Sequence, residues 1–385
     1  MPAATTWNTC VPRPTPRDCS SDSWTPIPTC GMWAREASRR ARGRWRSCAD
    51  GWAVAESGRA LLVGKVAESW SRRVEEWPSA EPAEGEVVVR VEWSGINYKD
   101  GLAASEKGRV ARIDPLVPGV DLAGTVMGSR AAGIAEGDAV VVHGYDLGVA
   151  RHGGYATHAV VPGDWVVPMP AGLDARGAMT VGTAGYTAAL SVAALERAGL
   201  RPGGGPVLVT GATGGVGSMA VAMLARLGHE VVASTGKADA HAWLTGLGAS
   251  RVVGREETAA ESPKPLERET WAGAVDCVGG TTLAYALRTC RYGASVAASG
   301  LTGGVALATT VMPFILRGVN LLGIDSVQTP IVRRREVWGR IGGDLRPADL
   351  AAMEARVVGL DGLPAELDRI LRGEMRGRVL VDPHR

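Results

Sequence analysis

The segment Val209–Gly217, with the sequence Val-Thr-Gly-Ala-Thr-Gly-Gly-Val-Gly, has the residue types that bind a pyrophosphate. It follows a short apolar run, Pro206–Thr210, and precedes a stretch in which apolar residues recur at helical spacing. Small residues let the backbone approach a phosphate, and a helix N-terminus supplies free N–H groups and a partial positive charge. Ala212, Gly214 and Gly217 match the G-x-G-x-x-G pattern with alanine at the first position. The motif predicts a dinucleotide-binding turn, and a purely structural glycine turn is the alternative.

The end of the next strand distinguishes the two nicotinamide cofactors. NAD-binding sites place an acidic residue there, about 20 residues after the glycine turn, to hold the ribose 2′-hydroxyl. This chain has Ser234, Thr235, Gly236 and Lys237 instead, and Arg255 follows the third strand. A carboxylate would repel a 2′-phosphate, whereas Thr235 can donate to it and Lys237 can neutralise its charge. We therefore expect NADPH; the alternative is a solvated Lys237 and a site indifferent to the phosphate.

Two repeating patterns must position these residues. Between residues 58 and 182, short strand-like runs such as Ala60–Val63 and Glu86–Trp93, separated by glycine turns, predict an all-β barrel or sandwich. Over residues 183–318, strands alternate with helices, which predicts a doubly wound parallel sheet and an α/β fold class for the chain. Residues 319–385 have too few alternations for a domain, so we expect this segment to return to the β unit.

Composition limits the class of protein. The chain has 385 residues, 45% of them hydrophobic, with 42 basic against 40 acidic residues and a net charge of +2. This is enough for two domains with cores, and the charge balance offers no case for nucleic acid binding. The sequence has no run of about 18 apolar residues, so we do not expect a membrane span.

Residues 1–57 differ from the rest of the chain. They hold eight arginines, no lysine, six prolines and four of the six cysteines, without helical or strand periodicity. No Cys-x-x-Cys pair is present to favour zinc, and a disulfide-stabilised cap would need a signal peptide with an apolar core. We expect a disordered extension or a start site assigned too far upstream; an Arg-rich presequence is the alternative, although the prolines oppose its helix. Cys277 and Cys290 are expected to be buried thiols in a reducing compartment.

Several longer stretches carry a resemblance to a known family. They are Trp93–Asp100, Pro118–Val126, Gly153–Ala156, Gly182–Ala188 and Thr310–Arg317. Over residues 58–385 the chain resembles the medium-chain dehydrogenase/reductase superfamily. The stretches are similar to its zinc-independent, quinone-oxidoreductase-like branch, and within it to the NADPH-dependent acryloyl-CoA reductases. The resemblance implies a GroES-like catalytic domain at residues 58–182 and a Rossmann domain at residues 183–318.

Zinc ligands are not expected. Zinc alcohol dehydrogenases of the superfamily carry a cysteine where this chain has Asn97–Tyr98, and a Gly-His-Glu where it has Gly119–Asp121. They also carry a four-cysteine lobe that this sequence does not contain. The resemblance therefore implies direct hydride transfer from NADPH to the β-carbon of an α,β-unsaturated acyl-CoA.

That chemistry needs hydrogen bonds to an enolate oxygen and a proton for the α-carbon. The resemblance implies that Tyr98 could supply the proton or bind the nicotinamide ribose, and that Asn97 could stabilise the enolate. Asp100 and Asp121 are expected to form a polar network with Arg378 around the cleft. The alternatives are structural: a core tyrosine, a turn asparagine, a helix-capping Asp100 and an Asp121 that only pairs with Arg378.

The resemblance also nominates contacts to the cofactor. They are Thr213, Gly214, Gly215 and Val216 at the pyrophosphate, Thr235, Gly236, Lys237 and Arg255 at the adenosine phosphate, and Tyr98, Leu301, Ile315 and Ser326 along the nicotinamide half. Arg372–Gly373 stands where family members often carry an asparagine, so the end wall of this site could be altered. The run Arg333–Arg335 is expected to be a solvated face, although it could meet the phosphates of coenzyme A. His143, His152 and His158 are expected to be barrel-surface or structural residues, and a catalytic histidine is the alternative.

The function implied is the NADPH-dependent reduction of acryloyl-CoA to propanoyl-CoA. A reductase of quinones or enals is the alternative among enzymes, and a catalytically silent NADPH-binding protein is the alternative outside them. The expected protein is a cytoplasmic homodimer without a membrane or nucleic-acid partner, and the dimer is implied by relatives alone.

Overall fold

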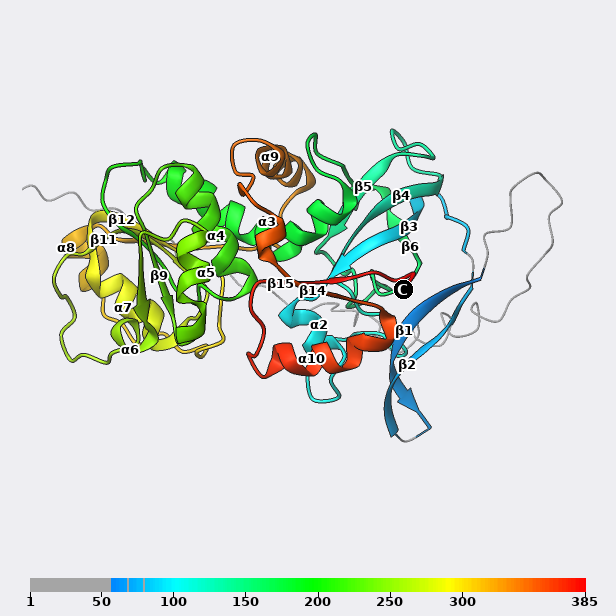
Figure 1. Cartoon of the computed structure of the whole chain (residues 1–385), viewed down its shortest axis with the longest axis horizontal. Coiled ribbons are helices and arrows are strands. Elements are labelled where there is room, and N and C mark those ends of the chain that lie inside the picture. Colours follow the sequence, from blue (N-terminus) through cyan, green and yellow to red (C-terminus); the bar gives the residue numbers. More distant parts are fainter. Residues whose placement is uncertain (1–56, 68, 79) are drawn as a thin grey trace, which may run out of the picture. The chain divides into compact units, whose positions relative to one another are not determined.

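The computed structural model describes residues 57–67, 69–78 and 80–385. These residues contain two large β-sheets (Figure 1). The predictions for residues 1–56, including their four cysteines, lie outside the described residues. All described residues belong to one compact unit. One sheet arises from the short strand-like runs separated by glycine turns, and the other arises from the strands that alternate with helices.

The barrel part contains a seven-stranded sheet in the order β14-β15-β3-β4-β5-β7, with β6 also paired to β3. Its strands are β3 (Glu86–Gly95), β4 (Asp121–Ser129), β5 (Ala139–His143), β6 (His158–Pro162), β7 (Val167–Pro168), β14 (Glu354–Val358) and β15 (Arg378–Val381). All pairs are antiparallel except β14 with β15. In β3, Val87, Val89 and Val91 are buried and Arg90 is exposed, as expected for a strand with one face on a core.

A separate hairpin precedes this sheet. It consists of β1 (Gly58–Val66) and β2 (Ser69–Trp77), which pair only with each other. The apolar residues Ala60–Val63 of β1 are buried against Ile96 and Tyr155, so this run was readable from the sequence. Strand β2 was not predicted, because its Arg- and Glu-rich sequence contributes no fully buried residue and lacks an apolar run.

The second large sheet is parallel throughout, in the order β10-β9-β8-β11-β12-β13. Its strands are β8 (Val207–Val209), β9 (Val231–Thr235), β10 (Arg251–Gly254), β11 (Trp271–Asp276), β12 (Cys290–Ala298) and β13 (Asn320–Gly323). Val207 packs in the same core as helix α4 (Gly215–Arg226), whereas the neighbouring Leu208 packs with helix α7 (Gly280–Thr289) on the other face. Helices on both faces confirm the doubly wound sheet.

Helix α3 (Ala175–Arg197) connects the two sheets, and it begins before residue 183, where the Rossmann domain was expected to start. It changes direction at Gly182, whose φ of 53° and ψ of −160° are not helical. The helix is long and apolar enough to cross a membrane, but 89% of its apolar window is buried inside the fold. Its composition therefore reflects a core position between barrel and sheet.

The remaining helices are short. They are α2 (Tyr98–Ala103), α5 (His241–Gly246), α6 (Arg255–Thr258), α8 (Met312–Arg317), α9 (Ile331–Gly342) and α10 (Leu363–Leu371), with single 3₁₀ turns at Gly163–Trp165, Ala238–Ala240, Ala351–Met353 and Leu360–Gly362. Helix α2 lies at the end of β3 and packs against α10 (Figure 1).

The C-terminal segment differs in part from the expectation. Strand β13 adds to the parallel sheet beside β12, and only the chain after it joins the barrel, where β14 and β15 extend the antiparallel sheet. The return to the barrel therefore begins after residue 323 and not at residue 319. The reason is that Asn320–Gly323 supplies the edge strand that β12 would otherwise lack.

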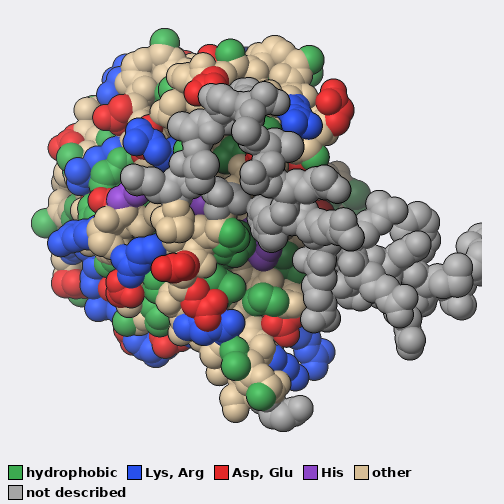
Figure 2. All heavy atoms as spheres, turned by 90° about the vertical axis from the view of Figure 1, so that its right-hand side faces the viewer, with side chains coloured by type: hydrophobic (Ala, Val, Ile, Leu, Met, Phe, Trp, Pro, Cys, Tyr) green, Lys and Arg blue, Asp and Glu red, His purple; other side chains and the backbone are tan. Residues whose placement is uncertain are grey.

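The face drawn in Figure 2 mixes basic and acidic side chains. Ion pairs also form between side chains that are at least partly exposed, among them Arg59 with Asp361 and Arg151 with Glu86, both at 2.8 Å. Interspersed charges of this kind give a solvated surface without a strong field of one sign.

Candidate active site

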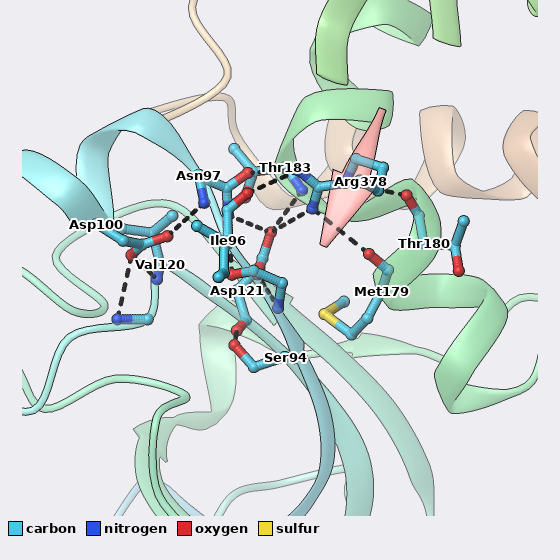
Figure 3. Close-up of polar contacts among 12 residues, drawn as sticks. Ser94, Ile96, Asn97, Asp100, Val120, Asp121, Met179, Thr180, Thr183 and Arg378 are labelled. Atoms are coloured by element: carbon cyan, nitrogen blue, oxygen red, sulfur yellow. Dashed lines mark hydrogen bonds and ion pairs between the residues drawn. The ribbon is translucent and has the colours of Figure 1, made fainter. Parts of the chain in front are cut away.

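A buried carboxylate, Asp121, lies where the end of β3, the start of β4 and the break in α3 meet (Figure 3). Its oxygens accept hydrogen bonds from Gly95 N (3.0 Å), Asn97 Nδ2 (2.8 Å) and Thr183 N (2.8 Å). Thr183 opens the second part of α3, so the break at Gly182 aims a helix N-terminus at the carboxylate. These donors stabilise a negative charge that burial alone would disfavour.

Arg378, the first residue of β15, is the cation of this network. Its Nη2 lies 3.7 Å from Asp121 Oδ2, and both side chains are almost fully buried. The guanidinium also donates to the carbonyls of Thr180 (3.1 Å) and Ile96 (3.1 Å). Burial lowers the pKa of Arg378 from its ordinary value, and Asp121 raises it in the opposite direction. The hydrogen bonds and the ion pair of the guanidinium therefore hold Arg378 in one place.

Asn97 connects the two charges. Its Oδ1 accepts from Arg378 Nη1 at 3.2 Å, and its Nδ2 donates to Asp121 at 2.8 Å and to Gly95 O at 3.4 Å. The last bond is long and therefore the weakest of the three. Arg378 and Asp121 thus determine the orientation of the Asn97 amide. The N–H that makes the long bond to Gly95 O is the one that can turn to another acceptor.

Asp100 is also completely buried, but it faces a different set of donors. Its carboxylate accepts from the backbone N–H groups of Asn97 (2.8 Å), Gly119 (3.1 Å) and Val120 (2.8 Å). It caps the first turn of α2 and holds the loop before β4 against it, which matches the helix-capping alternative. Desolvation by burial, and then the charge of Asp121, raise the pKa of Asp100 to about 7.

Tyr98 stands apart from this network. It is the first residue of α2 and is 39% exposed. Within the described part of the chain its hydroxyl has no hydrogen-bond partner. Tyr98 is therefore not a core tyrosine.

The glycine turn has the geometry that the sequence predicted for a pyrophosphate site. It follows β8, and Gly214 is extended immediately before α4 begins at Gly215. A Cβ at Gly217 would lie 2.4 Å from Gly211 O, so only glycine allows the helix to pack so close to the turn. A Cβ at Gly215 would lie 3.4 Å from Arg378, so the turn and the barrel network are neighbours.

The residues nominated for the adenosine phosphate are brought together, and Thr213, nominated for the pyrophosphate, lies beside them. Thr213 Oγ1 and Thr235 Oγ1 are 3.3 Å apart, and Lys237 N donates to Thr235 Oγ1 at 3.1 Å. The guanidinium of Arg255 lies beside Gly236, since a Cβ there would be 3.0 Å from it. Burial, and the charge of Arg255, lower the pKa of Lys237 from its ordinary value. Two cations and two hydroxyls thus converge at one strand end, which fits a phosphorylated ribose.

The end wall of this site comes from the C-terminal segment. Lys237 Nζ donates to Met375 O at 2.6 Å, and Gly377 N donates to Thr213 O at 3.0 Å. The stretch after Arg372–Gly373 therefore closes the site with backbone groups.

The nicotinamide-half residues are less closely grouped. Leu301 follows β12, and its Cα would be 3.3 Å from a Cβ at Gly279, beside the glycine turn. Ser326 is half-buried in the loop after β13. Ile315 is 70% exposed on α8, and no described contact joins it to the turn.

Some residues of the network were not singled out from the sequence. Ser94 Oγ donates to Asp121 O at 2.7 Å, and Thr180 supplies the carbonyl that holds Arg378. Ser94 lies in the run Trp93–Asp100, but a serine in a strand has no distinguishing signal. Thr180 acts through its backbone, which no side-chain pattern could reveal.

Comparison with known proteins places this geometry in a family. The family model "Alcohol dehydrogenase GroES-like domain" matches residues 83–171, and "Zinc-binding dehydrogenase" matches residues 215–338. The chain is 52% identical over 325 residues to the acrylyl-CoA reductase AcuI of Ruegeria pomeroyi, covering 84% of this chain and 98% of that protein. The chain belongs to the medium-chain dehydrogenase/reductase superfamily.

Other members of the superfamily are similarly close. The putative quinone oxidoreductase YhfP of Bacillus subtilis is 50% identical over 84% of this chain and 98% of its own length. Its crystal structure with NAD bound matches with a TM-score of 0.83 over 85% of this chain and all of that chain, at 49% identity. The YhdH oxidoreductase of Salmonella enterica in complex with NADP matches with a TM-score of 0.81, at 46% identity over 84% of this chain and 99% of that chain. The superfamily and the GroES-like and Rossmann parts are confirmed.

The zinc in the name of one family model does not fit this member of the superfamily. Among residues 57–67, 69–78 and 80–385, no group of three or more His, Cys, Asp or Glu side chains could hold a metal ion. The position expected for a zinc-ligating cysteine is Asn97–Tyr98, and Asp121 is already held by N–H donors.

Proposed function

We propose that this chain is an NADPH-dependent reductase of the carbon–carbon double bond of α,β-unsaturated acyl-CoA, with acryloyl-CoA as substrate and propanoyl-CoA as product. The observation that carries the proposal is the 52% identity with an acrylyl-CoA reductase over 98% of its length. The buried Asn97–Asp121–Arg378 network beside the cofactor turn supports it.

The cofactor proposed is NADPH, held by Thr213 to Val216 at the pyrophosphate and by Thr235 to Lys237 with Arg255 at the 2′-phosphate. When bound, it supplies a hydride to the β-carbon of the double bond. Lys237 after β9 and Arg255 after β10 support the phosphorylated cofactor, since the stretch Ser234–Lys237 contains no acidic residue to hold a free 2′-hydroxyl. Leu301, Ile315, Ser326 and Tyr98 are proposed for the nicotinamide half.

The residues of the barrel would act on the thioester. As the β-carbon gains hydride, negative charge moves to the carbonyl oxygen, which needs a hydrogen-bond donor. Asn97 Nδ2 can provide it by exchanging its long bond to Gly95 O, while Arg378 and Asp121 keep the amide oriented. Arg378 and Asp121 are thus proposed to position Asn97, and Asp100 to hold α2 and its neighbouring loop in place.

Tyr98 is the proposed proton donor. Its O–H bond would break as the C–H bond forms at the α-carbon, and solvent would return a proton to the hydroxyl, because the side chain is partly exposed. A role in binding the nicotinamide ribose is the alternative.

The test compares NADPH oxidation with acryloyl-CoA, with a simple quinone and with an enal, and repeats each assay with NADH. Efficient reduction of the thioester with NADPH is expected. Reduction of the quinone or enal alone would favour the second candidate, which the 50% identity with a putative quinone oxidoreductase supports. Tight NADPH binding without any turnover would indicate a silent binding protein.

A homodimer is also part of the proposal. Exposed apolar side chains gather around α8 and the edge strand β13, namely Val305, Val311, Ile315, Leu316 and Leu321. A face of this kind beside an edge strand favours pairing with a second copy. Light scattering after size-exclusion chromatography should give twice the chain mass of 40.0 kDa, and the mass of one chain would refute the dimer.

We place the enzyme in the cytoplasm. Cys277 and Cys290 are both unoxidised thiols, and burial raises the pKa of Cys290 to about 12. Cys290 is buried as expected, whereas Cys277 is only partly buried. Thiols that form no disulfide are compatible with a reducing compartment.

A further inference from the structure

Helix α9 carries an arginine that is buried without a carboxylate. Arg334 is 0% exposed, and among the described residues no Asp or Glu forms an ion pair with it. Its neighbour Arg333 pairs with Glu336, as an exposed arginine commonly does. The predicted solvated face is therefore wrong for Arg334. A buried guanidinium is costly unless other groups compensate its charge, so its partners identify its role.

Backbone carbonyls and aromatic rings provide the compensation. Arg334 Nη1 donates to His143 O at 2.5 Å, and Nη2 donates to Val327 O at 3.0 Å and to Thr329 O at 3.4 Å. The guanidinium carbon also lies 4.3 Å from the ring centre of Tyr145 and 5.4 Å from that of Tyr186. The planar fork thus joins two segments that are far apart in the sequence, the end of β5 and residues 325–329.

His143 behaves as part of this structure and not as an acid or base. Trp338 Nε1 donates to its Nε2 at 2.8 Å. Burial and the charge of Arg334 hold the pKa of His143 well below its ordinary value, so the ring is neutral.

The segment held by Arg334 has its own tight geometry. The N–H groups of Val327 and Gln328 donate to Asp325 Oδ1, and Tyr145 N donates to Val327 O at 2.9 Å. Tyr145 has a φ of 49°, in the left-handed region that non-glycine residues rarely adopt. Its hydroxyl donates to Thr329 O at 3.1 Å. Tyr145 keeps this uncommon backbone conformation because its N–H and its hydroxyl are both bonded to residues 327–329.

Arg334 holds together the end of β5 and residues 325–329, and both of these segments lie beside proposed site residues. His143 is the register partner of Asp121 in the β4–β5 pair. On the other side, Ser326 lies within residues 325–329. Burial lowers the pKa of Lys99, the residue after Tyr98, and the charges of Asp100 and then of Asp325 oppose this shift, so Asp325 lies near Lys99. A shift of the segment would therefore change the distance between the nicotinamide-half residue and the substrate residues.

We propose that Arg334 is a positioning residue, which clamps residues 325–329 against the end of β5 and so sets the wall of the cleft between cofactor and substrate. The proposal rests on the proposed function, because it concerns the same cleft. Arg334 acts on the reaction only through the segment that it holds.

The experiment compares Arg334→Lys with Arg340→Lys. Arg340 lies on the same helix and forms ion pairs with Glu196 and Asp344, away from residues 325–329, so it controls for a general weakening of α9. Lysine keeps the charge of Arg334 but cannot reach three carbonyls at once. For Arg334→Lys, kcat with acryloyl-CoA should fall about tenfold or more, because small misplacements in a cleft are costly. The dissociation constant for NADPH should change by less than about threefold, since the phosphate contacts lie elsewhere.

Hydrogen exchange provides a second measurement on the same variants. The amides of Val327 and Gln328 should exchange faster in Arg334→Lys than in Arg340→Lys. Equal kcat values for the two variants, at a temperature where circular dichroism shows both folded, would overturn the proposal. Equal exchange at these two amides would overturn it as well.

The outcome separates this proposal from the proposed function. If the wild-type protein reduces a quinone and not the thioester, the proposed function fails, and the same comparison of kcat is made with the quinone. If the wild-type protein turns over neither, the exchange measurement alone decides whether Arg334 holds the segment.

Discussion

At the scale of single residues, the buried polar groups and the one accessible hydroxyl have separate tasks. Asp121, Arg378 and Asn97 satisfy one another, and their burial makes the arrangement rigid. Tyr98 is partly exposed and uncommitted, which suits a group that must exchange a proton with substrate and solvent. We therefore propose that Asp121 and Arg378 hold the geometry, and that Asn97 and Tyr98 are the groups that act on the substrate.

Tyr98→Phe tests the role of this hydroxyl. We expect kcat with acryloyl-CoA to fall by about 10²-fold or more, because a general acid contributes on that order. The dissociation constant for NADPH, measured by fluorescence titration, should stay within about twofold. Tyr292→Phe, at an exposed position of β12, is the matched control and should have no effect. Weaker NADPH binding with unchanged kcat would assign Tyr98 to the ribose.

Asp100 makes the stability of the protein depend on pH. Its pKa is raised from 3.8 to about 7 in the folded protein, so the fold keeps a proton that the unfolded chain releases within this range. The stability contributed by this group is complete below about pH 4 and is lost as the pH rises through about 7. Urea denaturation of wild type and Asp100→Asn at several pH values measures it. As the pH rises from about 4 to about 7, the free energy of unfolding of the wild type should fall relative to that of Asp100→Asn. A difference that does not vary with pH would contradict the raised pKa.

At the scale of elements, two glycines make the site possible. Gly182 breaks α3 so that Thr183 N faces Asp121, and Gly217 lets α4 approach the turn that follows β8. Both positions are ones where a Cβ would meet protein atoms at close range: 2.5 Å from Arg378 at Gly182 and 2.4 Å from Gly211 O at Gly217. The glycines thus join the barrel network to the cofactor turn.

Gly217→Ala should therefore disrupt the cofactor site. The clash with backbone atoms is expected to lower the free energy of unfolding by about 1–3 kcal/mol and to weaken NADPH binding. Gly339→Ala in α9 is the control, because nothing lies within 4 Å of its Cβ position, and it should raise stability by about 0.5–1 kcal/mol. Thermal denaturation and NADPH titration measure both effects. Unchanged NADPH affinity in a folded Gly217→Ala protein would show that the turn does not hold the cofactor.

At the scale of the whole molecule, the two sheets and the C-terminal strands form one catalytic unit. The matches to the relatives that share half of the sequence cover 84% of this chain and 98% of the relatives' own length, so part of this chain lies outside the match. Strand β15 returns from the end of the chain to bring Arg378 to the network, so the site combines residues of the barrel with the C-terminal segment.

Removal of residues 1–57 should leave the enzyme active. The expected kcat and KM with acryloyl-CoA are within about twofold of those of the full chain, because every residue of the proposed site lies beyond this segment. Steady-state kinetics on the shortened protein measure this directly. A large loss of activity, with the remaining chain folded by circular dichroism, would assign the segment a role in catalysis.

The sequence by itself determined the kind of fold and the cofactor turn, because both depend on local patterns. Alternating strands and helices, and small residues between a strand and a helix, predict a doubly wound sheet and its phosphate-binding turn without knowledge of distant contacts. Residue types at the end of β9 likewise indicated the phosphorylated cofactor. Strand β2 and the position of β13 were not readable, because their pairing depends on partners rather than on their own apolar pattern.

Only the tertiary structure decided which polar residues act together. Asp121 and Arg378 are separated by most of the chain, and their pairing depends on β15 adding to β3 beside the break in α3. Arg334 appears in the sequence as one of three consecutive arginines, and its burial against three carbonyls follows from packing alone. Local patterns report the preferences of a segment, whereas burial and partners are properties of the assembled molecule.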